Sequence, residues 1–288
     1  MKINLLLAFG DNAISLFLLN QLNCPKYVEG TYLTKKVMEL CEFDNKFHLT
    51  HNFIKIPAFY NIKNSSLLNI IKDFIKFYFL LKEGDYEINI LEKEDFRSKI
   101  LSLISFNFFY TPLRNKNVYL DRKALIEELY SQDLILHPLA RYSNGTNIVI
   151  NPTSRLEIKN IKINELKLII NILNINGKEV TLIDYDGRYK ELKSSVSLYY
   201  EKTELNFAVE LLKKSDFYIG ADSFFIHLSY IFKIPFYIYF NFENEYFMPP
   251  FCIKENNFIV SSKYNMDTMK KKLCNDLTRL KLITNKIQ

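Results

Sequence analysis

The polar residues best placed for chemistry follow a short apolar run in the second half of the chain. Residues 217–219 have the pattern of a buried strand, and Asp222 and Ser223 come directly before the helical spacing of residues 225–232. The first turn of a helix presents backbone amides that attract anions. The segment predicts half of an anion site. His227, one turn on, either reaches the ligand or is an ordinary buried histidine.

A second group of polar residues follows the apolar run at 147–151, which also reads as a buried strand. Its members carry hydroxyl, guanidinium and ammonium groups, which together hold clusters of anionic oxygens such as a diphosphate. They are Thr153, Ser154, Arg155 and Lys159. We expect this loop to form the other half of the same site; a solvated turn with surface charges is the alternative.

Asp11 is the candidate general base. Residues 2–8 read as a strand buried on both faces, residues 9–12 as a turn, and a helical pattern follows. Gly10 allows a sharp turn, and the adjacent helix N-terminus favours an ionised carboxylate. Such a carboxylate can take a proton from a hydroxyl group. Alternatively, Asp11 or Asn12 is only an N-cap.

These candidates require elements that bring strand ends together. After a run of turn formers at residues 143–146, strands alternate with helices, which is typical of a parallel sheet covered on both faces. The strands are expected at 147–151, 179–183, 217–219 and 236–240, and the helices at 163–173, 205–213, 225–232 and 266–282. We predict an α/β chain of two Rossmann-like domains, residues 1–145 and 146–288, whose sheets face a cleft.

The first half has weaker patterns. A strand is expected at 86–91 and helices at 67–82 and 96–104. The helix at 67–82 is rich in aromatic residues with lysines interleaved, so it either docks on an anionic membrane surface or is buried against a neighbour.

Composition excludes several classes. Lys plus Arg number 38 against 32 Asp plus Glu, and a net charge of +6 is too small and dispersed for a dedicated nucleic-acid binder. The four cysteines lie far apart and the histidines lack metal spacing, so we expect no metal and no disulfide framework. Neither a signal peptide nor a membrane-spanning run is expected. The usual motifs of hydrolases, nucleoside triphosphatases and dinucleotide enzymes do not occur.

Three segments resemble glycosyltransferase family 9, the heptosyltransferases of lipopolysaccharide synthesis. LLLAFGDNAISLFLLNQL resembles the family's first strand, Gly-Asp turn and helix, and SDFYIGADSFFIHLSYIFKIPFYIYF resembles its nucleotide-site helix. INPTSRLEIKNI is similar to the family's loop of small residues with a lysine. In the second segment, Asp222, Ser223, His227 and Pro235 match the family pattern in order and spacing.

The resemblance implies a GT-B fold with the acceptor on the first domain and the nucleotide sugar on the second. It implies a metal-independent inverting glycosyltransferase without a cofactor, with Asp11 as general base, Lys159 near the diphosphate, and Asp222 and Ser223 around the phosphates. The donor would be a nucleotide sugar such as ADP-heptose, and the acceptor a glycan or lipid-linked glycan. The expected location is cytoplasmic, with the inner-membrane surface as a candidate contact.

Two positions depart from the family pattern. Phe224 stands where the family has Gly, and residues 160–162 stand where it has a basic residue, Trp and Pro. An aromatic side chain crowds a place where backbone and diphosphate approach closely. Two alternatives therefore stay open: a non-catalytic module that binds nucleotide sugars, or a GT-B enzyme that uses a CMP-, GDP- or UDP-sugar.

Overall fold

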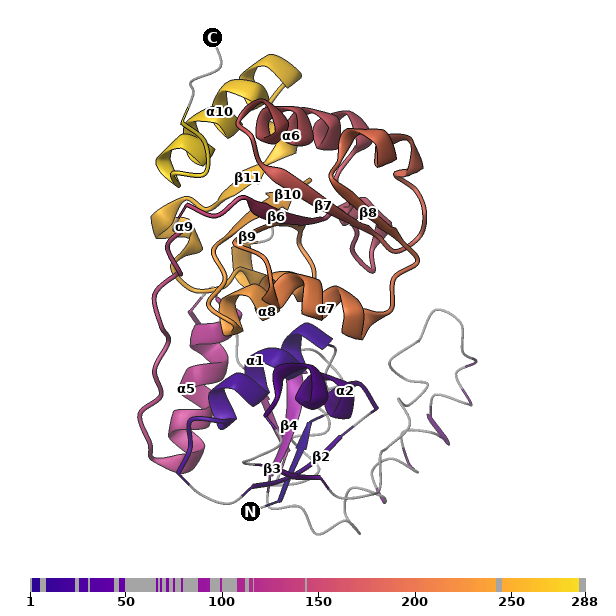
Figure 1. Ribbon diagram of the computed structural model, residues 1–288. Helices are drawn as coiled ribbons and strands as arrows, with labels where there is room; N and C mark the ends of the chain where they lie inside the picture. Colours follow the sequence, from indigo (N-terminus) through magenta and orange to yellow (C-terminus); the bar gives the residue numbers. More distant parts are fainter. Residues whose placement is uncertain are drawn as a thin grey trace. The chain divides into compact units, whose positions relative to one another are not determined.

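The computed structural model divides the chain into two compact units, Met1–Ile135 and Leu136–Gln288. Each unit contains a parallel β-sheet flanked by helices (Figure 1). The structure describes residues 2–5, 9–23, 26–30, 32–43, 47–49, 88–93, 108–111, 114–115, 117–142, 144–241 and 245–284, with single positions between 66 and 99.

In the first unit, the described strands pair in parallel in the order β3-β2-β1-β4-β5. The elements are β1 (Lys2–Leu5), α1 (Phe9–Leu19), β2 (Lys26–Gly30), α2 (Tyr32–Cys41), β3 (Phe47–Leu49), β4 (Ile88–Lys93), β5 (Phe108–Thr111) and α5 (Val118–Tyr130). Because the strand order reverses between β1 and β4, the segment after β1 lies at the place where such sheets bind ligands.

In the second unit, the strands pair in parallel in the order β11-β10-β9-β6-β7-β8. The strands are β6 (Asn147–Asn151), β7 (Glu179–Asp184), β8 (Leu198–Glu201), β9 (Phe217–Ala221), β10 (Phe236–Phe240) and β11 (Phe258–Val260). The α-helices are α6 (Ile163–Ile175), α7 (Leu205–Lys213), α8 (Phe224–Ile231), α9 (Cys252–Glu255) and α10 (Met266–Arg279). Short 3-10 turns occupy Glu157–Lys159, Lys190–Ser195, Glu245–Phe247 and Ser261–Lys263.

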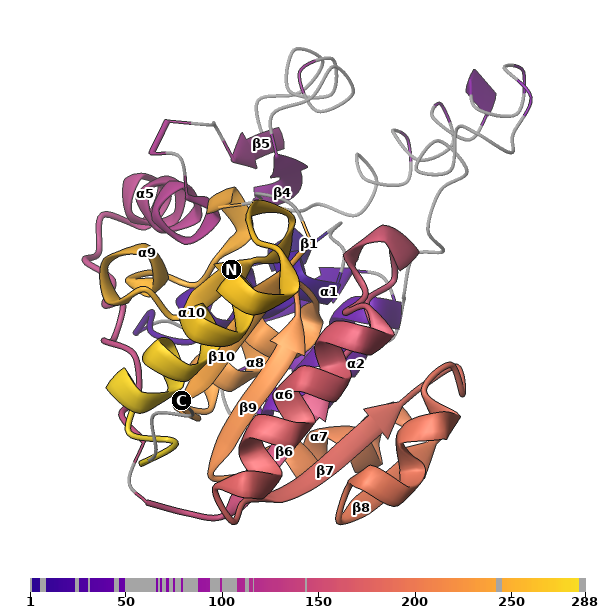
Figure 2. The same ribbon diagram turned by 90° about the horizontal axis from the view of Figure 1, so that it is seen from above.

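Apolar patterning explains the layers of the second unit. The strands β9 and β10 are buried along their whole length, as expected for parallel strands covered on both faces. Helices α6 and α10 cover one face and α7 and α8 the other (Figures 1 and 2). In α6 the buried residues Leu166, Ile169, Ile170 and Leu173 recur at helical spacing and form one apolar stripe.

The end of α6 depends on a glycine. Gly177 has a φ of +67°, a conformation that glycine adopts without steric cost. The amide of Lys178 then donates to the carbonyl of Leu173 at 3.1 Å, which satisfies one of the last helical carbonyls. The chain can therefore turn directly into β7.

The structure corrects the expected start of the first helix. Residues 9–12 were expected to form a turn, but α1 begins at Phe9 and contains Gly10, Asp11 and Asn12. Glycine costs little in a first turn that lacks most of its intrahelical bonds, and the acidic Asp11 suits the positive end of the helix dipole. Asn12 is not an N-cap either: its side chain accepts a hydrogen bond from Thr34 Oγ1 at 3.3 Å.

The compact units divide after residue 135, ten residues before the boundary expected after residue 145. The reason is that residues 136–142 contact later residues of the second unit. Tyr230 donates to the carbonyl of His137 at 2.8 Å, and the rings of Tyr142 and Phe217 meet edge to face at 5.6 Å. The chain thus joins the second unit before its first strand.

Two expected helices of the first half lie largely outside the described residues. Of the span 67–82, the structure describes Leu68, Ile71, Lys72, Ile75 and Phe79, all helical and exposed. Of the span 96–104, it describes Lys99. Within the described part of the chain, none of the helices combines the length and the apolar character that a membrane crossing needs.

Candidate functional site

The candidate site of the second unit lies at the edge where β6 and β9 end. These strands are parallel neighbours, and Asn151 at the end of β6 is paired with Gly220 near the end of β9. From β6 the chain crosses to β7 on one side, and from β9 it crosses to β10 on the other side. The segments that follow the two strands therefore flank the crevice in which parallel α/β sheets bind ligands.

Lys159 and Asp222 form the central contact of this edge. Nζ of Lys159 lies 2.5 Å from Oδ2 of Asp222, and Oγ of Ser154 donates to the backbone carbonyl of Asp222 at 2.9 Å. The side chains of Lys159 and Asp222 are only 19% and 9% exposed. The fold thus brings together the two segments expected to form the anion site, and it holds an ammonium group beside the start of α8.

Two asparagines that sequence reasoning missed fix the loop after β6. Oδ1 of Asn160 accepts from the amide of Ser154 at 2.7 Å. Nδ2 of Asn241 donates to the carbonyls of Ile158 and Asn160 at 2.8 and 2.6 Å. Asn241 directly follows β10, so its place at a strand end was a usable signal. Asn160 can be recognised only once the loop is folded.

The other expected residues occupy different environments. Thr153 is buried and its hydroxyl donates to Asn151 Oδ1 at 2.8 Å, whereas Arg155 is exposed. Ser223 is the N-cap residue of α8 by its backbone, but its side chain does not cap the helix amides. His227 is 6% exposed, which agrees with the interpretation as a core histidine.

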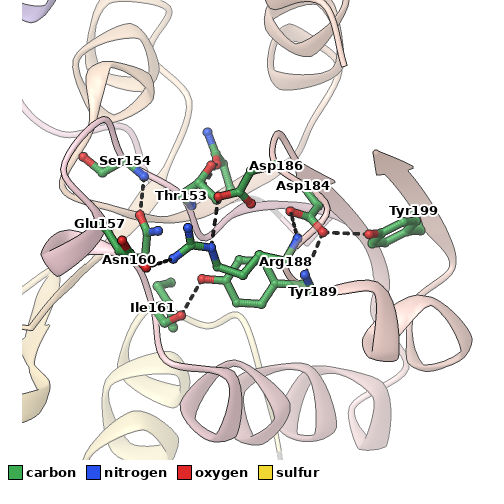
Figure 3. Close-up of polar contacts among 11 residues, drawn as sticks. Thr153, Ser154, Glu157, Asn160, Ile161, Asp184, Asp186, Arg188, Tyr189 and Tyr199 are labelled. Carbon is green, nitrogen blue, oxygen red and sulfur yellow. Dashed lines mark hydrogen bonds and ion pairs between the residues drawn. The ribbon is translucent and has the colours of Figure 1, made fainter. Parts of the chain in front are cut away.

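Asp184, at the end of β7, organises the neighbouring loop (Figure 3). Its carboxylate accepts from the amides of Arg188 at 3.2 Å and Tyr189 at 2.8 Å, and from the hydroxyl of Tyr199 at 2.7 Å. Burial, and then this hydrogen bond to Asp184, raises the pKa of Tyr199. The tyrosine therefore stays a donor, and the buried carboxylate is satisfied from three sides.

The loop after β7 is also tied to the loop after β6 (Figure 3). Arg188 lies 2.7 Å from Glu157 Oε1 and 3.0 Å from Asp186 Oδ2, and the hydroxyl of Tyr189 donates to the carbonyl of Ile161 at 2.6 Å. The ion pairs are exposed and contribute little energy, but the buried tyrosine bond is shielded from water. Two adjacent strand-end loops are thus held as one scaffold.

Buried hydroxyl groups lie beneath the start of α8. Tyr185 and Tyr218 both pack against Phe225: their ring centroids lie 6.1 and 6.2 Å, respectively, from that of Phe225. The hydroxyl of Tyr218 extends over Gly220. Burial raises the pKa of Tyr218, and the hydroxyl of Ser223 opposes this shift. Burial likewise raises the pKa of Tyr185. Both phenols stay protonated, so this end of β9 presents neutral hydrogen-bonding groups.

The candidate base of the first unit lies in the first turn of α1, just after β1. The side chain of Asp11 is 19% exposed, and its Oδ1 lies 3.5 Å from Nη2 of Arg122, a residue that sequence reasoning did not select. The same guanidinium donates through Nη1 to the hydroxyl of Ser15 at 2.9 Å. Asp11 is therefore one partner of an ion pair and faces solvent in part.

Among the described residues, no group of three or more His, Cys, Asp or Glu side chains is arranged to hold a metal ion. The described cysteines, Cys41, Cys252 and Cys274, are buried.

The fold matches known structures, although no protein-family profile matches the sequence and no curated protein matches it. Heptosyltransferase WaaC of E. coli, solved with ADP, aligns with a TM-score of 0.65 and 12% identity over 96% of this chain and 100% of that chain. The glycosyl transferase family 9 protein of Veillonella parvula gives 0.62 and 11% identity over 97% and 96%. The UDP-GlcNAc 2-epimerase of Methanocaldococcus jannaschii gives 0.52 and 12% over 96% and 92%.

These matches confirm the predicted GT-B fold and, at the level of the fold, the resemblance to family 9. They cover nearly the whole chain, including the first half, in which few elements were expected. At such low identity they show architecture alone, because one fold hosts many activities. Function has to be inferred from the residues at the strand ends.

Proposed function

We propose that this chain is an inverting glycosyltransferase that moves a sugar, such as heptose from ADP-heptose, onto a lipopolysaccharide core or another surface glycan. The observation that carries the proposal is the Lys159–Asp222 contact at the reversal point between β6 and β9. It places a shielded cation at the start of a helix, in a chain with the heptosyltransferase fold.

The donor side follows from electrostatics. Asp222 holds the ammonium of Lys159 in place and balances its charge when no ligand is bound. A diphosphate arriving at the start of α8 would meet this ammonium, the hydroxyl of Ser154 and the first amides of the helix. Lys159 would then share its three donors between Asp222 and the phosphate oxygens.

Residues of both units would take part in the chemical step. The carboxylate of Asp11 takes the proton of the acceptor hydroxyl as that oxygen bonds to the anomeric carbon. The bond between this carbon and the diphosphate oxygen breaks, and the nucleoside diphosphate leaves with the electron pair. Lys159 and the helix amides stabilise the charge that develops on the leaving group.

Calorimetry with nucleoside diphosphates and their sugars tests the donor site. We expect binding of one nucleotide class, ADP for a heptosyl donor, and a loss of about tenfold to over a hundredfold in affinity for Lys159→Ala, because a charged hydrogen bond contributes about 1.5–3 kcal/mol. The matched control is Lys162→Ala, because Lys162 is 67% exposed three residues further on. Equal affinity in both variants and the parent would place the phosphates elsewhere.

The second candidate function is a module that binds nucleotide sugars without transfer. It is favoured by Phe224, which stands at the first position of α8, its ring edge to face with that of Phe225 at 6.2 Å. A transfer assay separates the two. Turnover that disappears in Asp11→Asn while donor affinity stays unchanged supports the transferase, whereas donor binding without turnover in the parent supports the module.

A further inference from the structure

Arg122 is a deeply buried cation in contact with Asp11, the proposed base. Its side chain is 1% exposed, and one guanidinium contacts Asp11 through Nη2 at 3.5 Å and Ser15 through Nη1 at 2.9 Å. Asp11 and Ser15 are four residues apart and so lie on one face of α1 in successive turns. The guanidinium therefore bridges two turns of the helix that carries the candidate base.

The helix that carries Arg122 is fixed at its own N-terminus. Asn117 caps α5, accepting from the amides of Tyr119 and Leu120 at 3.0 and 3.3 Å. The buried Asp121 accepts from the amides of Arg114 and Asn115 at 3.1 and 2.7 Å and so ties the preceding segment to the same turn. Arg122 thus projects from a turn with little freedom to move.

We propose that Arg122 is the positioning residue of Asp11, an inference that rests on the proposed transferase function. A carboxylate in a first turn can rotate among several staggered conformers, and only some of them direct an oxygen at an acceptor hydroxyl. The rigid guanidinium fork selects one conformer by engaging Oδ1, while the hydrogen bond to Ser15 keeps the fork itself from swinging. In the described contacts of Asp11 the ion pair uses Oδ1, which leaves Oδ2 to receive the proton.

A purely structural role is the alternative, in which Asp11 serves only to neutralise a buried arginine. The two roles differ in what substitution changes. A positioning role predicts slower turnover in folded protein with the donor affinity of the second unit intact. A structural role predicts lost stability, with the remaining folded protein turning over normally.

The experiment compares Arg122→Lys and Ser15→Ala with Lys123→Met as control. Arg122→Lys keeps the charge and loses the fork, and Ser15→Ala keeps the ion pair and loses its anchor. The control removes a neighbouring cation of α5 that pairs with Glu127 and leaves the Asp11 contact untouched. We expect kcat to fall about ten- to a hundredfold in Arg122→Lys and less in Ser15→Ala, because misplacing a reacting group by about 1 Å costs up to a hundredfold. Donor KM and the kcat of Lys123→Met should stay as in the parent.

The outcomes separate the inference from its premise. If folded Arg122→Lys and Ser15→Ala turn over like the parent, or if Lys123→Met loses as much, the positioning role is overturned and the transferase stands. If Arg122→Lys fails to fold, Ser15→Ala decides alone. If the parent transfers no sugar from any nucleotide donor, the proposed function fails, and the role of Asp11 as base fails with it.

Discussion

Gly220 shows how a single missing side chain shapes the candidate site. A Cβ atom at this position would lie 2.1 Å from the hydroxyl and 2.4 Å from Cζ of Tyr218. Contacts this short require the buried phenol ring to move. The glycine is therefore needed for space, because the phenol of Tyr218 occupies the place that a side chain at residue 220 would take.

At this residue scale we predict that Gly220→Ala destabilises the second unit by about 1–3 kcal/mol, the usual cost of forcing extra volume into a packed interior. Urea unfolding followed by circular dichroism measures the change. In Tyr218→Ala the ring is absent, so adding Gly220→Ala to that background should cost much less than in the parent. Equal costs in the two backgrounds would show that the phenol ring is not the obstacle.

Residues adjacent to strand ends could be predicted from the sequence, and those joined by distant contacts could not. Lys159 and Asp222 each follow an apolar run, and the rule that parallel strands end at one edge is enough to bring them together. Arg122 meets Ser15 across 107 positions of sequence, with no local pattern to mark it. The N-cap alternative for Asp11 was wrong because residues 9–12 were interpreted as a turn before the helix, although they form the first turn of α1.

At the scale of elements, continuous apolar runs were reliable and short or half-exposed segments were not. Apolar runs predicted four strands whose first and last residues lie within two residues of the observed bounds: β6, β7, β9 and β10. Two strands had no recognisable pattern: β8, whose residues are exposed or half-buried, and β11, which has three residues. Edge strands like these lack a pattern of their own, because neighbours in the sheet stabilise them.

Residues 136–142, which begin the second unit, include a titratable histidine that stacks on a tyrosine. His137 lies on Tyr230 with ring centroids 4.2 Å apart, and the Tyr230 hydroxyl donates to the His137 carbonyl. Desolvation by burial lowers the pKa of His137. A hydrogen bond to the Pro138 carbonyl raises this pKa, and the positive charge of Lys233 lowers it further. The folded chain therefore favours the neutral ring.

For this segment we predict that acid lowers the stability of the folded chain. The imidazole ring of His137 in the unfolded chain titrates at about pH 6.5. Since the folded pKa is lower, the unfolded chain binds the proton first, and stability falls as the pH drops below about 6.5. His137→Phe keeps an aromatic ring on Tyr230 but cannot titrate. The difference in melting temperature between parent and variant should change across that range; a constant difference would contradict the role of His137.

At the scale of the whole molecule, the alternation of strands and helices after residue 146 predicted the parallel sheet of the second unit, whereas the first half carried only weak patterns. The fold comparisons confirm the predicted α/β GT-B fold. The proposed function assigns the general base to the first unit and the contacts with the donor phosphates to the second unit. Because the units are compact individually, ligand binding should stabilise them unequally.

Hydrogen exchange with and without nucleoside diphosphate tests this division. At a hundredfold excess over Kd, a ligand that binds only the folded state stabilises it by about 2.7 kcal/mol, and amides that exchange through unfolding of that unit slow accordingly. We expect protection in residues 152–161 and 220–228, which flank the ends of β6 and β9, and little change in α1 and α5. Lys159→Ala at the same ligand concentration should lose most of this protection. Protection that appears mainly in the first unit would contradict the assignment of the donor to the second.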